Sequence, residues 1–359
     1  MTENRKAEHL RICLTEDVQA KKVTTGFEDV HLVHKAVPEF GLGDVDTSIS
    51  FFGKELRAPI IIEAMTGGTP DALKINMNLA EAAEHFGLAM GVGSQRAALE
   101  TPRLIDTFRV VREKGPNIFL VANLGLPQIV ANNGVESAES AVEMIKADAL
   151  AIHLNSLQEA IQREGETEFH NSLEKIGEVV SRLSVPVIVK ETGAGIAMED
   201  VRLLSQTGVK GIDVGGAGGT SWAAVESYRE AGLKHRLGVT FWDWGVPTAI
   251  SVAEAASSTD LKVIASGGLR TGLDICKAIC LGASMAGLAW PLLKPADLGQ
   301  LDHALGMLIE EFRTSMFLIG AENVVDLEQR PIVITGKMAE WLRLRGLSPE
   351  AYARRQKRV

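Results

Sequence analysis

The chain has 359 residues, of which 46% are hydrophobic and 23% are charged, and its 46 acidic residues outnumber its 37 basic residues to give a net charge of −9. This apolar content supports a large core and excludes a disordered chain. The acidic balance argues against nucleic acid as a partner, and no apolar run reaches the roughly 18 residues that a membrane-spanning helix needs.

From residue 59 onward, short β-branched runs alternate with longer helical patterns. The candidate strands are Ile60–Glu63, Leu88–Val92, Ile118–Ala122, Ala149–His153, Val187–Lys190, Gly211–Val214, Val263–Ala265 and Ser284–Leu288. The helical patterns between them include Asp71–Phe86, Ser137–Ala147, Asn171–Leu183, Met198–Gln206 and Thr271–Leu281. Because parallel strands are buried on both faces, this alternation predicts a TIM (β/α)8 barrel. An open doubly wound sheet is the main alternative.

We divide the chain into three segments: an N-terminal segment expected to cap the substrate (1–58), the barrel (59–296) and C-terminal helices that pack on it (297–359). The first segment ends in a predicted antiparallel cap, Asp46–Phe52 followed by Gly53 and Lys54. The connection 215–262 is unusually long and rich in Gly and Trp, which predicts a lid or binding loop. The last segment contains a predicted amphipathic helix, Leu298–Ile319.

The cysteines and the opening residues bear on the cellular compartment. Cys13, Cys276 and Cys280 have neither CxxC nor zinc-ligand spacing, which predicts a reducing compartment and no structural metal. The opening sequence, MTENRKAEHL, has no apolar segment and does not have the form of a secretory signal. We therefore expect a cytoplasmic protein.

Glycine or a polar residue follows every candidate strand, and in a barrel these positions meet at one rim. Gly267 and Gly268 follow the seventh strand and Thr271 opens the next helix. Exposed backbone N–H groups and the positive end of that helix favour a bound phosphate. Tight turns are the alternative explanation of these glycines. The glycine-rich stretch 215–219 after the sixth strand favours a phosphate-bearing cofactor over that alternative.

Lys190 ends the fifth strand, and a lysine inside a barrel mouth must have an anionic partner or lose its charge. It is a candidate Schiff-base nucleophile, cofactor partner or member of a structural ion pair. Glu159, after the fourth strand, is a candidate ligand for Mg²⁺, which prefers oxygen atoms. A helix-capping box formed by Ser156 and Glu159 is the alternative. Arg96 follows the second strand, and its planar fork suits an anion.

Several blocks in this order resemble type 2 isopentenyl-diphosphate isomerase, a flavin-dependent enzyme family, over nearly the whole chain. The blocks include Arg5-Lys6 with His9, Ala64-Met65-Thr66-Gly67-Gly68, Gly93-Ser94-Gln95-Arg96, Asn123-Leu124-Gly125, His153-Leu154-Asn155 with Gln158-Glu159, Lys190-Glu191-Thr192-Gly193, Asp213 to Trp222, Trp244-Gly245-Val246-Pro247-Thr248 and Ser266-Gly267-Gly268-Leu269-Arg270-Thr271. One departure concerns the loop after the metal glutamate, where the family often has Gln-Pro-Glu-Gly-Asp and this chain has Gln162-Arg163-Glu164-Gly165-Glu166.

The resemblance implies interconversion of isopentenyl and dimethylallyl diphosphates with reduced FMN, Mg²⁺ and NADPH as reductant. It implies that FMN is bound by Ala64, Met65, Thr66, Ser94, Asn123, Lys190 and Thr220, and its phosphate by Gly267, Gly268, Ala289 and Trp290. It implies substrate contacts from Arg5, Lys6, His9, Ser94, Gln95, Arg96, His153, Asn155 and Gln158, with Mg²⁺ on Glu159. The candidate catalytic residues are Gln158, Lys190 and His153. The family also implies a cytoplasmic homo-oligomer, a tetramer or an octamer.

The leading alternative is an FMN-dependent α-hydroxy-acid oxidase or dehydrogenase on the same barrel. Those enzymes resemble this chain at the lysine and the glycine pair, but they carry a His followed closely by Gly and Arg after the sixth strand. Here that stretch, 215–220, contains neither His nor Arg, so the base that would begin oxidation of a hydroxy acid is missing.

Overall fold

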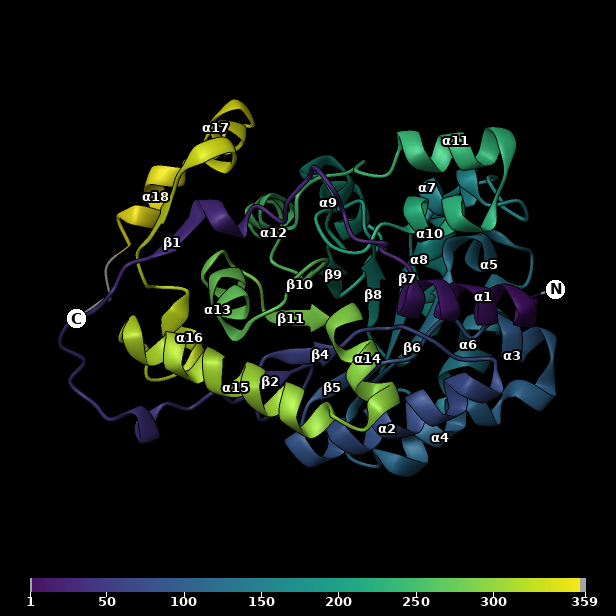
Figure 1. Ribbon diagram of the computed structural model, residues 1–359, viewed down its shortest axis with the longest axis horizontal. Helices are drawn as coiled ribbons and strands as arrows, with labels where there is room; N and C mark the ends of the chain where they lie inside the picture. The colour runs from purple at the N-terminus through teal and green to yellow at the C-terminus, as the bar shows by residue number, and fades with distance from the viewer. Residues whose placement is uncertain (1, 356–359) are drawn as a thin grey trace.

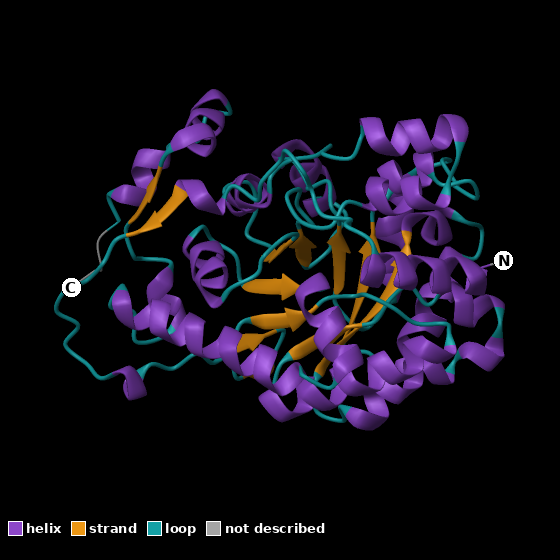
Figure 2. Ribbon diagram, in the orientation of Figure 1, coloured by secondary structure: helices purple, strands orange, loops and turns teal. Residues whose placement is uncertain are grey.

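Eight parallel strands close into a barrel in the order β10-β11-β4-β5-β6-β7-β8-β9, as the computed structural model of the chain shows (Figures 1 and 2). The structure describes residues 2–355, with side chains described from residue 4. The barrel strands are β4 (Ile60–Ile62), β5 (Ala89–Gly91), β6 (Phe119–Gly125), β7 (Ala149–His153), β8 (Val187–Lys190), β9 (Gly211–Asp213), β10 (Lys262–Ser266) and β11 (Met285–Leu288). Each predicted run overlaps one of these strands, so the predicted TIM barrel is confirmed.

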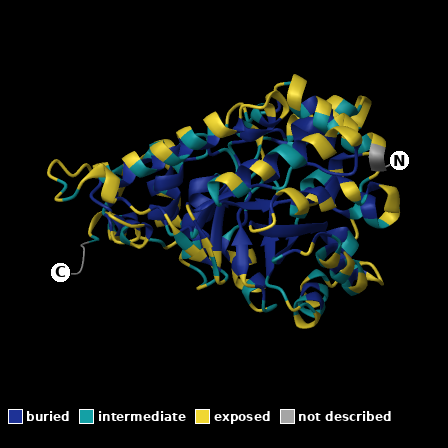
Figure 3. Cartoon of the chain, turned by 90° about the horizontal axis from the view of Figure 1, so that it is seen from below, coloured by how far each residue is buried: buried dark blue, intermediate teal, exposed yellow. Residues whose placement is uncertain are grey.

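Helices surround the barrel, and their outer faces carry the exposed residues (Figure 3). They are α1 (Thr2–Thr15), α2 (Pro70–Phe86), α3 (Arg96–Glu100), α4 (Asp106–Lys114), α5 (Leu126–Val130), α6 (Gly134–Ile145), α7 (Ser156–Ile161), α8 (Ser172–Arg182), α9 (Met198–Ser205), α10 (Trp222–Arg229), α11 (Gly232–Thr240), α12 (Thr248–Ala256), α13 (Gly272–Cys280), α14 (Trp290–Leu298), α15 (Leu301–Leu318), α16 (Val324–Leu327), α17 (Gly336–Leu344) and α18 (Pro349–Ala353). Short 3₁₀ helices cover 27–29, 42–44 and 102–104. Within the described residues, no helix combines the length and the apolar character needed to cross a membrane.

Alternate residues of each barrel strand face opposite ways, as the pleat requires. On β4, Ile60 and Ile62 pack outward with the helices, whereas Ile61 packs into the barrel interior. On β8, Val189 packs outward and Ile188 inward. The strands are buried on both faces, which explains their nearly continuous apolar runs.

The predicted antiparallel element at the end of the N-terminal segment is a hairpin of β2 (Ile49–Phe51) and β3 (Lys54–Leu56). Its turn residues, Phe52 and Gly53, both have positive φ angles, of 47° and 81°, as tight hairpin turns require. Phe51 and Leu56 join the interior cluster that includes Ile61 and Phe119, and the rings of Phe51 and Phe119 meet edge to face at 5.4 Å. The hairpin therefore closes the amino-terminal end of the barrel.

The two ends of the chain pair with each other through β1 (Val30–Leu32) and β12 (Ile332–Ile334). Residues 1 and 356–359, which belong to the predicted terminal segments, lie outside the described residues.

Two predicted elements differ from the structure. The predicted helix Leu298–Ile319 is wrong at its start: Leu298 ends α14, Gly299 adopts a left-handed φ of 70°, and α15 begins at Leu301. The connection 215–262, expected as a lid or binding loop, is not one long loop, since much of it folds into α10, α11 and α12, but Gly215, Thr220 and Trp222 near its start line the cavity described below.

Shortening the side chain of Phe51 in the β2–β3 hairpin should destabilise the folded protein. Phe51 is 1% exposed, and replacing a buried Phe by Ala costs about 3–5 kcal/mol through lost burial and the cavity left behind. Phe51→Ala is therefore expected to lower the denaturant midpoint and the thermal midpoint strongly. Leu344→Ala, at a position that is 81% exposed, is the control and should leave both unchanged. Equal effects of the two substitutions would contradict the closing role of the hairpin.

Candidate active site

A cavity of about 260 Å³ opens at the carboxyl ends of the barrel strands. Strands β4 and β11 point toward α1, which supplies part of the cavity wall (Figure 1). The predicted site residues that line this cavity are Arg5, Lys6, His9, Ala64, Met65, Thr66, Ser94, Arg96, Asn123, His153, Asn155, Gln158, Glu159, Lys190, Thr220, Gly267, Gly268, Ala289 and Trp290. The structure thus brings together residues that are up to 285 positions apart, from Arg5 to Trp290.

The convergence follows from the pleat. Interior positions of the barrel are apolar at one level, with Ile61, Val121, Ala151 and Ile188 in one cluster. Two residues further along each strand, the interior positions are polar or glycine: Glu63, Gly91, Asn123, His153, Lys190, Asp213, Ser266 and Gly287. Interior side chains that are two residues apart along a strand therefore belong to different layers, the first to the apolar core and the second to the polar floor of the cavity.

Gln95 is the exception among the predicted substrate-binding residues, and its position corrects that prediction. Its side chain is fully buried. The amide nitrogen donates to the carbonyl of Ala141 at 2.8 Å, and the amide oxygen accepts from the backbone N–H of Asn123 at 3.0 Å. The amide of Gln95 therefore connects β6 to α6 on the side facing away from the cavity, and the side chain does not line the cavity.

Lys190 lies between two buried carboxylates on the cavity floor. Its Nζ is 3.5 Å from Asp213 and 3.7 Å from Glu63, and it donates to the backbone carbonyl of Glu191 at 3.0 Å. Burial alone lowers the pKa of Lys190, but the charges of Asp213, Glu63 and Glu191 raise the pKa above its usual value. Of the alternatives for Lys190, the ion pair is present, and a Schiff-base role, which needs a neutral amine, is disfavoured.

His153 is held as a neutral imidazole. Burial, and then the charges of Lys190, Lys6 and Arg5, lower the pKa of His153 to about 3. Asn123 donates its amide N–H to the carbonyl of Val92, which turns its oxygen toward Nδ1 of His153 at 2.9 Å. Nδ1 is therefore the protonated nitrogen, and Nε2 is an acceptor.

The glycine pair packs so closely against the loop after β9 that neither position can carry a side chain, and the bare backbone of the two residues forms a cradle in the wall of the cavity. A Cβ on Gly267 would lie 2.1 Å from the carbonyl of Gly216, and one on Gly268 would lie 2.8 Å from the carbonyl of Gly218.

The predicted contribution of the helix that follows Thr271 is wrong, because the backbone N–H groups of Thr271 and Gly272 are bound by the side chains of Asp274 and Glu311. Helix α14 instead begins in the wall of the cavity at Trp290, and the first N–H groups of a helix have no partner within it. Backbone donors and a helix end are suited to a phosphate, so these residues fit the phosphate of FMN.

Arg270, a site residue that the sequence prediction missed, lines the same part of the cavity. Its guanidinium lies over the ring of Trp290, 5.2 Å from the centroid, and it donates to the side chain of Gln19. The sequence does contain an indication of this role, because Arg270 lies two residues after Gly268 in the same glycine-containing motif.

Cationic side chains gather at the opposite end of the cavity. Lys6 donates to the carbonyl of Ser94 at 2.5 Å, and burial, followed by the charge of Arg5, lowers the pKa of Lys6 to about 7. Arg96 binds Glu100 at 2.7 Å and Glu166 at 2.6 Å. Arg5, Lys6 and Arg96 therefore form a group of three cations that suits an anion. To bind that anion, Arg96 would release the carboxylates of Glu100 and Glu166.

Glu159 and two amides form an oxygen-rich group beside these cations. Glu159 accepts from Asn155 at 2.7 Å, from Gln162 at 2.5 Å and from the backbone N–H of Glu166 at 2.8 Å. No described residue hydrogen-bonds the buried amide oxygens of Asn155 and Gln162. Asn155, not Ser156, precedes the first turn of α7 and no side chain caps that turn, so the capping-box alternative is wrong.

This group fits Mg²⁺ only with help from a ligand. No cluster of three or more His, Cys, Asp or Glu side chains suited to a metal occurs within residues 2–355. Mg²⁺ needs few protein ligands when water and phosphate oxygens complete its shell. One carboxylate and two unpartnered amide oxygens satisfy that chemistry when a diphosphate is present.

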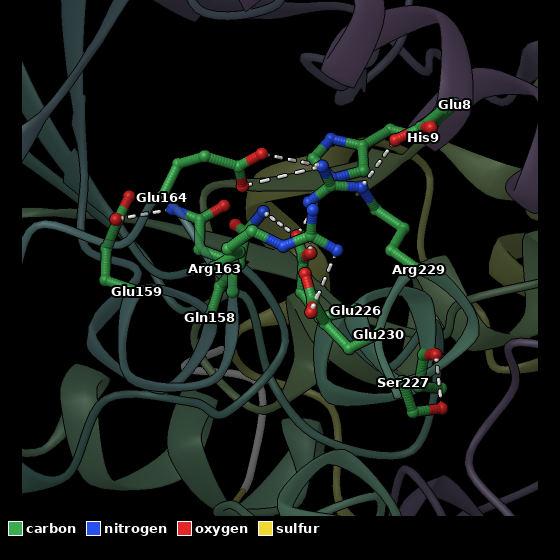
Figure 4. A network of polar contacts seen from close by, with 12 residues as sticks. Glu8, His9, Gln158, Glu159, Arg163, Glu164, Glu226, Ser227, Arg229 and Glu230 are labelled. Carbon is green, nitrogen blue, oxygen red and sulfur yellow. Dashed lines mark hydrogen bonds and ion pairs between the residues drawn. The ribbon is translucent and has the colours of Figure 1, made fainter. Parts of the chain in front are cut away.

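The loop after Glu159 is held without the proline of the family pattern. A Cβ on Gly165 would lie 1.8 Å from the carbonyl of Glu159, so the glycine is needed for the close approach of the two backbones. Glu164 pairs with Arg229 at 3.3 Å and Arg163 pairs with Glu230 at 3.4 Å. Both contacts fix the loop to α10 and its end (Figure 4).

Glu226 is a buried carboxylate that the sequence prediction missed. It accepts from Gln158 at 2.9 Å and from Arg229 at 2.6 Å, and its carboxylate lies 2.9 Å from Nε2 of His9. Arg229 also binds Glu8 on α1 at 3.0 Å, and Figure 4 shows these side chains converging from α1, α7 and α10. Glu226 lies inside a helix rather than at a strand end, so no pattern in the sequence singles it out.

Comparison with known proteins agrees with this geometry. A family model for FMN-dependent dehydrogenases matches residues 128–334. The isopentenyl-diphosphate delta-isomerase of Methanothermobacter thermautotrophicus is 49% identical, with 99% of this chain and 100% of that protein covered. The protein of the same name from Pyrococcus abyssi is 47% identical, with 94% of each chain covered.

Among solved structures, mandelate oxidase with (S)-2-phenylpropionate is similar in fold, with a TM-score of 0.62, 19% identity and coverage of 92% of this chain and 97% of that one. At that identity the likeness concerns the barrel alone. The relatives that match nearly end to end carry the functional name, and the chain therefore belongs to the isopentenyl-diphosphate delta-isomerase family of enzymes.

Proposed function

We propose that the chain interconverts isopentenyl diphosphate and dimethylallyl diphosphate, with reduced FMN as the acid and base and Mg²⁺ on the diphosphate. One observation carries the proposal: a single cavity has a phosphate cradle at one end, a charged Lys190 on its floor and three cations beside an oxygen-rich group at the other end. This layout suits a flavin phosphate and a substrate diphosphate bound side by side. The names of the nearly full-length relatives support the same reaction.

FMN would be held along the strand ends. The proposed contacts are Ala64, Met65, Thr66, Ser94, Asn123, Lys190 and Thr220 for the ring, and Gly267, Gly268, Ala289 and Trp290 for the phosphate. Arg270 is added to the phosphate contacts because it lines the cavity beside Trp290. The family model for FMN-dependent dehydrogenases supports this cofactor.

The isomerisation adds a proton to one carbon and removes a proton from another, with no net oxidation. Reduced FMN, when bound, supplies a ring nitrogen that donates and accepts that proton. The protein's share is to place the alkene against the ring and to anchor the diphosphate. Lys190 would provide a fixed positive charge on the floor of the cavity. This charge would stabilise negative charge on a reduced flavin, which the nearby buried carboxylates would otherwise repel.

Gln158 and His153 would face the substrate with defined polarity. The amide nitrogen of Gln158 is fixed by Glu226, so its oxygen is the atom available to the substrate or to a water. His153 would present Nε2 as a hydrogen-bond acceptor, since Nδ1 is fixed by Asn123. The two side chains orient the substrate, and they keep their polarity without any change of protonation near neutral pH.

Mg²⁺ would bind Glu159, Asn155 and diphosphate oxygens, while Arg5, Lys6, His9 and Arg96 contact the diphosphate. A local group of cations is necessary because the protein as a whole, with a net charge of −9, repels anions.

The alternative, a flavin oxidase for α-hydroxy acids, is supported by the family model for FMN-dependent dehydrogenases and by the fold of mandelate oxidase, whereas the nearly full-length relatives carry the isomerase name. The stretch 215–220 after β9 contains neither His nor Arg, so the cavity has no base and carboxylate clamp at that position.

Three further properties are proposals that rest on the family resemblance: reduction of the flavin by NADPH, assembly into a homo-oligomer of four or eight chains, and a cytoplasmic location.

The direct test is turnover. Protein reconstituted with FMN, reduced by light or dithionite and given isopentenyl diphosphate and Mg²⁺, is expected to form dimethylallyl diphosphate through many turnovers without consuming an equivalent of reductant. The same preparation in its oxidised form should not oxidise mandelate or lactate. Oxidation of a hydroxy acid without isomerisation would replace the proposed function by the alternative.

Removing the charge of Glu159 should weaken the response to Mg²⁺. Glu159→Gln replaces the only carboxylate of the proposed metal group, so the Mg²⁺ concentration for half-maximal activity is expected to rise by at least about tenfold, the equivalent of ~1.4 kcal/mol. Glu168→Gln, whose side chain is 86% exposed in the same region of the chain, is the control. An unchanged Mg²⁺ titration in Glu159→Gln would remove Glu159 from the metal site.

Lys6 should set an alkaline limit on substrate capture. The pKa of Lys6 is lowered to about 7, so the free enzyme loses this cation as the pH rises through neutrality, and kcat/KM for the diphosphate should fall. Lys6→Arg keeps its charge at all these pH values and should move the fall to higher pH. If both proteins show the same alkaline fall, Lys6 does not contact the diphosphate as a cation.

A further inference from the structure

Glu63 is a buried carboxyl group that the reaction described above does not use. It follows β4 at an interior position and is 6% exposed. Its side chain occupies the space left by a glycine on the neighbouring strand, since a Cβ on Gly287 would lie 2.4 Å from Oε1 of Glu63. The carboxyl group borders the cavity, on its floor.

The charged groups around Glu63 come from several strands. Lys190 on β8 is 3.7 Å away and is itself 3.5 Å from Asp213 on β9. Glu191, after β8, faces Lys190, but its carboxylate accepts three backbone N–H groups at 2.5–2.7 Å. His153 on β7 is neutral for the reasons given above. The group that shares Glu63's surroundings therefore consists of one ammonium and a second carboxylate.

The hydrogen bonds around this group leave one oxygen of Glu63 unused. Asp213 accepts from the hydroxyl of Ser266 at 2.5 Å, and Oε2 of Glu63 accepts from the backbone N–H of Ala64 at 3.3 Å. No described residue donates to the buried Oε1. A protonated Glu63 becomes a donor instead, and the carboxylate of Asp213 lies within its hydrogen-bonding reach.

Burial, and then the negative charge of Asp213, raise the pKa of Glu63 to about 8, although the charge of Lys190 opposes that shift. Near neutral pH, Glu63 is therefore a neutral acid, Asp213 is its acceptor and Lys190 has one anionic partner instead of two. As the pH rises through the pKa of Glu63, the floor gains a negative charge.

We propose that Glu63 is a positioning residue that sets how much positive charge Lys190 presents to a flavin bound above it. As an acid, Glu63 hydrogen-bonds Asp213 and leaves the ammonium free to stabilise a reduced, anionic ring. As a carboxylate, it competes for the ammonium and disfavours that ring. The inference rests on the proposed binding of FMN.

The proton balance follows from this coupling. Reducing the flavin adds an electron pair and a proton, supplied by an added reductant and by solvent, and leaves one negative charge on the ring. That charge increases the proton affinity of Glu63. Above the pKa of Glu63, reduction therefore draws a second proton from solvent onto the Glu63 carboxylate, and by linkage the flavin potential falls more steeply with pH.

The test is the midpoint potential of the FMN-loaded protein measured across this pH range. In the wild type, the slope of potential against pH is expected to double above the pKa of Glu63. In Glu63→Gln, which has the shape of the protonated acid and cannot titrate, the slope should stay constant, with wild-type potentials at neutral pH and higher potentials in alkali. Glu63→Asp, which keeps a titratable group, should restore a change of slope. Parallel lines for wild type and Glu63→Gln would overturn the inference.

A second carboxyl group near Lys190 serves as the matched control. Burial raises the pKa of Glu191 to about 7, so the change of slope must persist in Glu191→Gln; its loss there would assign the titration to Glu191 and reject Glu63.

Infrared spectra need no cofactor: in a Glu191→Gln background, which removes the second buried acid, the apoprotein should show a carboxylic-acid band at neutral pH that disappears in alkali and is absent when Glu63→Gln is added. Persistence of that band in the variant contradicts the inference. A protein that shows the band but cannot bind FMN refutes the proposed function instead.

Discussion

The buried charge of Lys190 is the constraint on which the site depends. An ammonium inside a barrel is stable only when paired, and removing its partners would leave an uncompensated charge at a cost of several kcal/mol. Near neutral pH the anionic partner is Asp213, on the strand next to that of Lys190, while the carboxyl group of Glu63 approaches the ammonium from the far side of the barrel mouth. The hydrogen bonds of Ser266 and Asn123 then fix the adjoining side chains. The polar floor is therefore one connected arrangement in which each strand end has a defined role.

A second buried group joins the floor to the helices that cover it. Glu226 binds Gln158 on α7 and Arg229 on α10, and it lies beside His9 on α1. Through Arg229 the same network reaches Glu8 and the loop at Glu164. The position of α1 over the cavity, which brings Arg5 and Lys6 into the cavity wall, is thus tied to Gln158, which lines the same cavity.

The sequence predicts the barrel well because its signal is local. Each strand is a short apolar run, and each is followed by glycine or a polar residue, so both the fold and the position of the rim can be read from neighbouring residues. The two-residue period of the strands also indicates which side chains form the floor of the cavity. Glu63 lies two residues after the interior Ile61, as Lys190 does after Ile188.

Contacts between distant elements could not be predicted in this way. Gln95 has the composition of a binding residue, and only the packing of α6 behind it shows that its amide faces away from the cavity. Glu226 and Arg229 form an ordinary helical pair in the sequence, and their importance depends on where α10 meets α1 and α7. The break at Gly299 was missed because the apolar pattern continues across it, while the backbone does not.

The central claim is that one cavity holds a flavin next to a diphosphate. Its most direct test is the absorption spectrum of the reduced, FMN-reconstituted protein during titration with isopentenyl diphosphate and Mg²⁺. We predict a flavin spectrum that changes saturably with the diphosphate and only weakly when Mg²⁺ is withheld. A protein that cannot be reconstituted with FMN, or a bound flavin whose spectrum is indifferent to the diphosphate, would contradict the account.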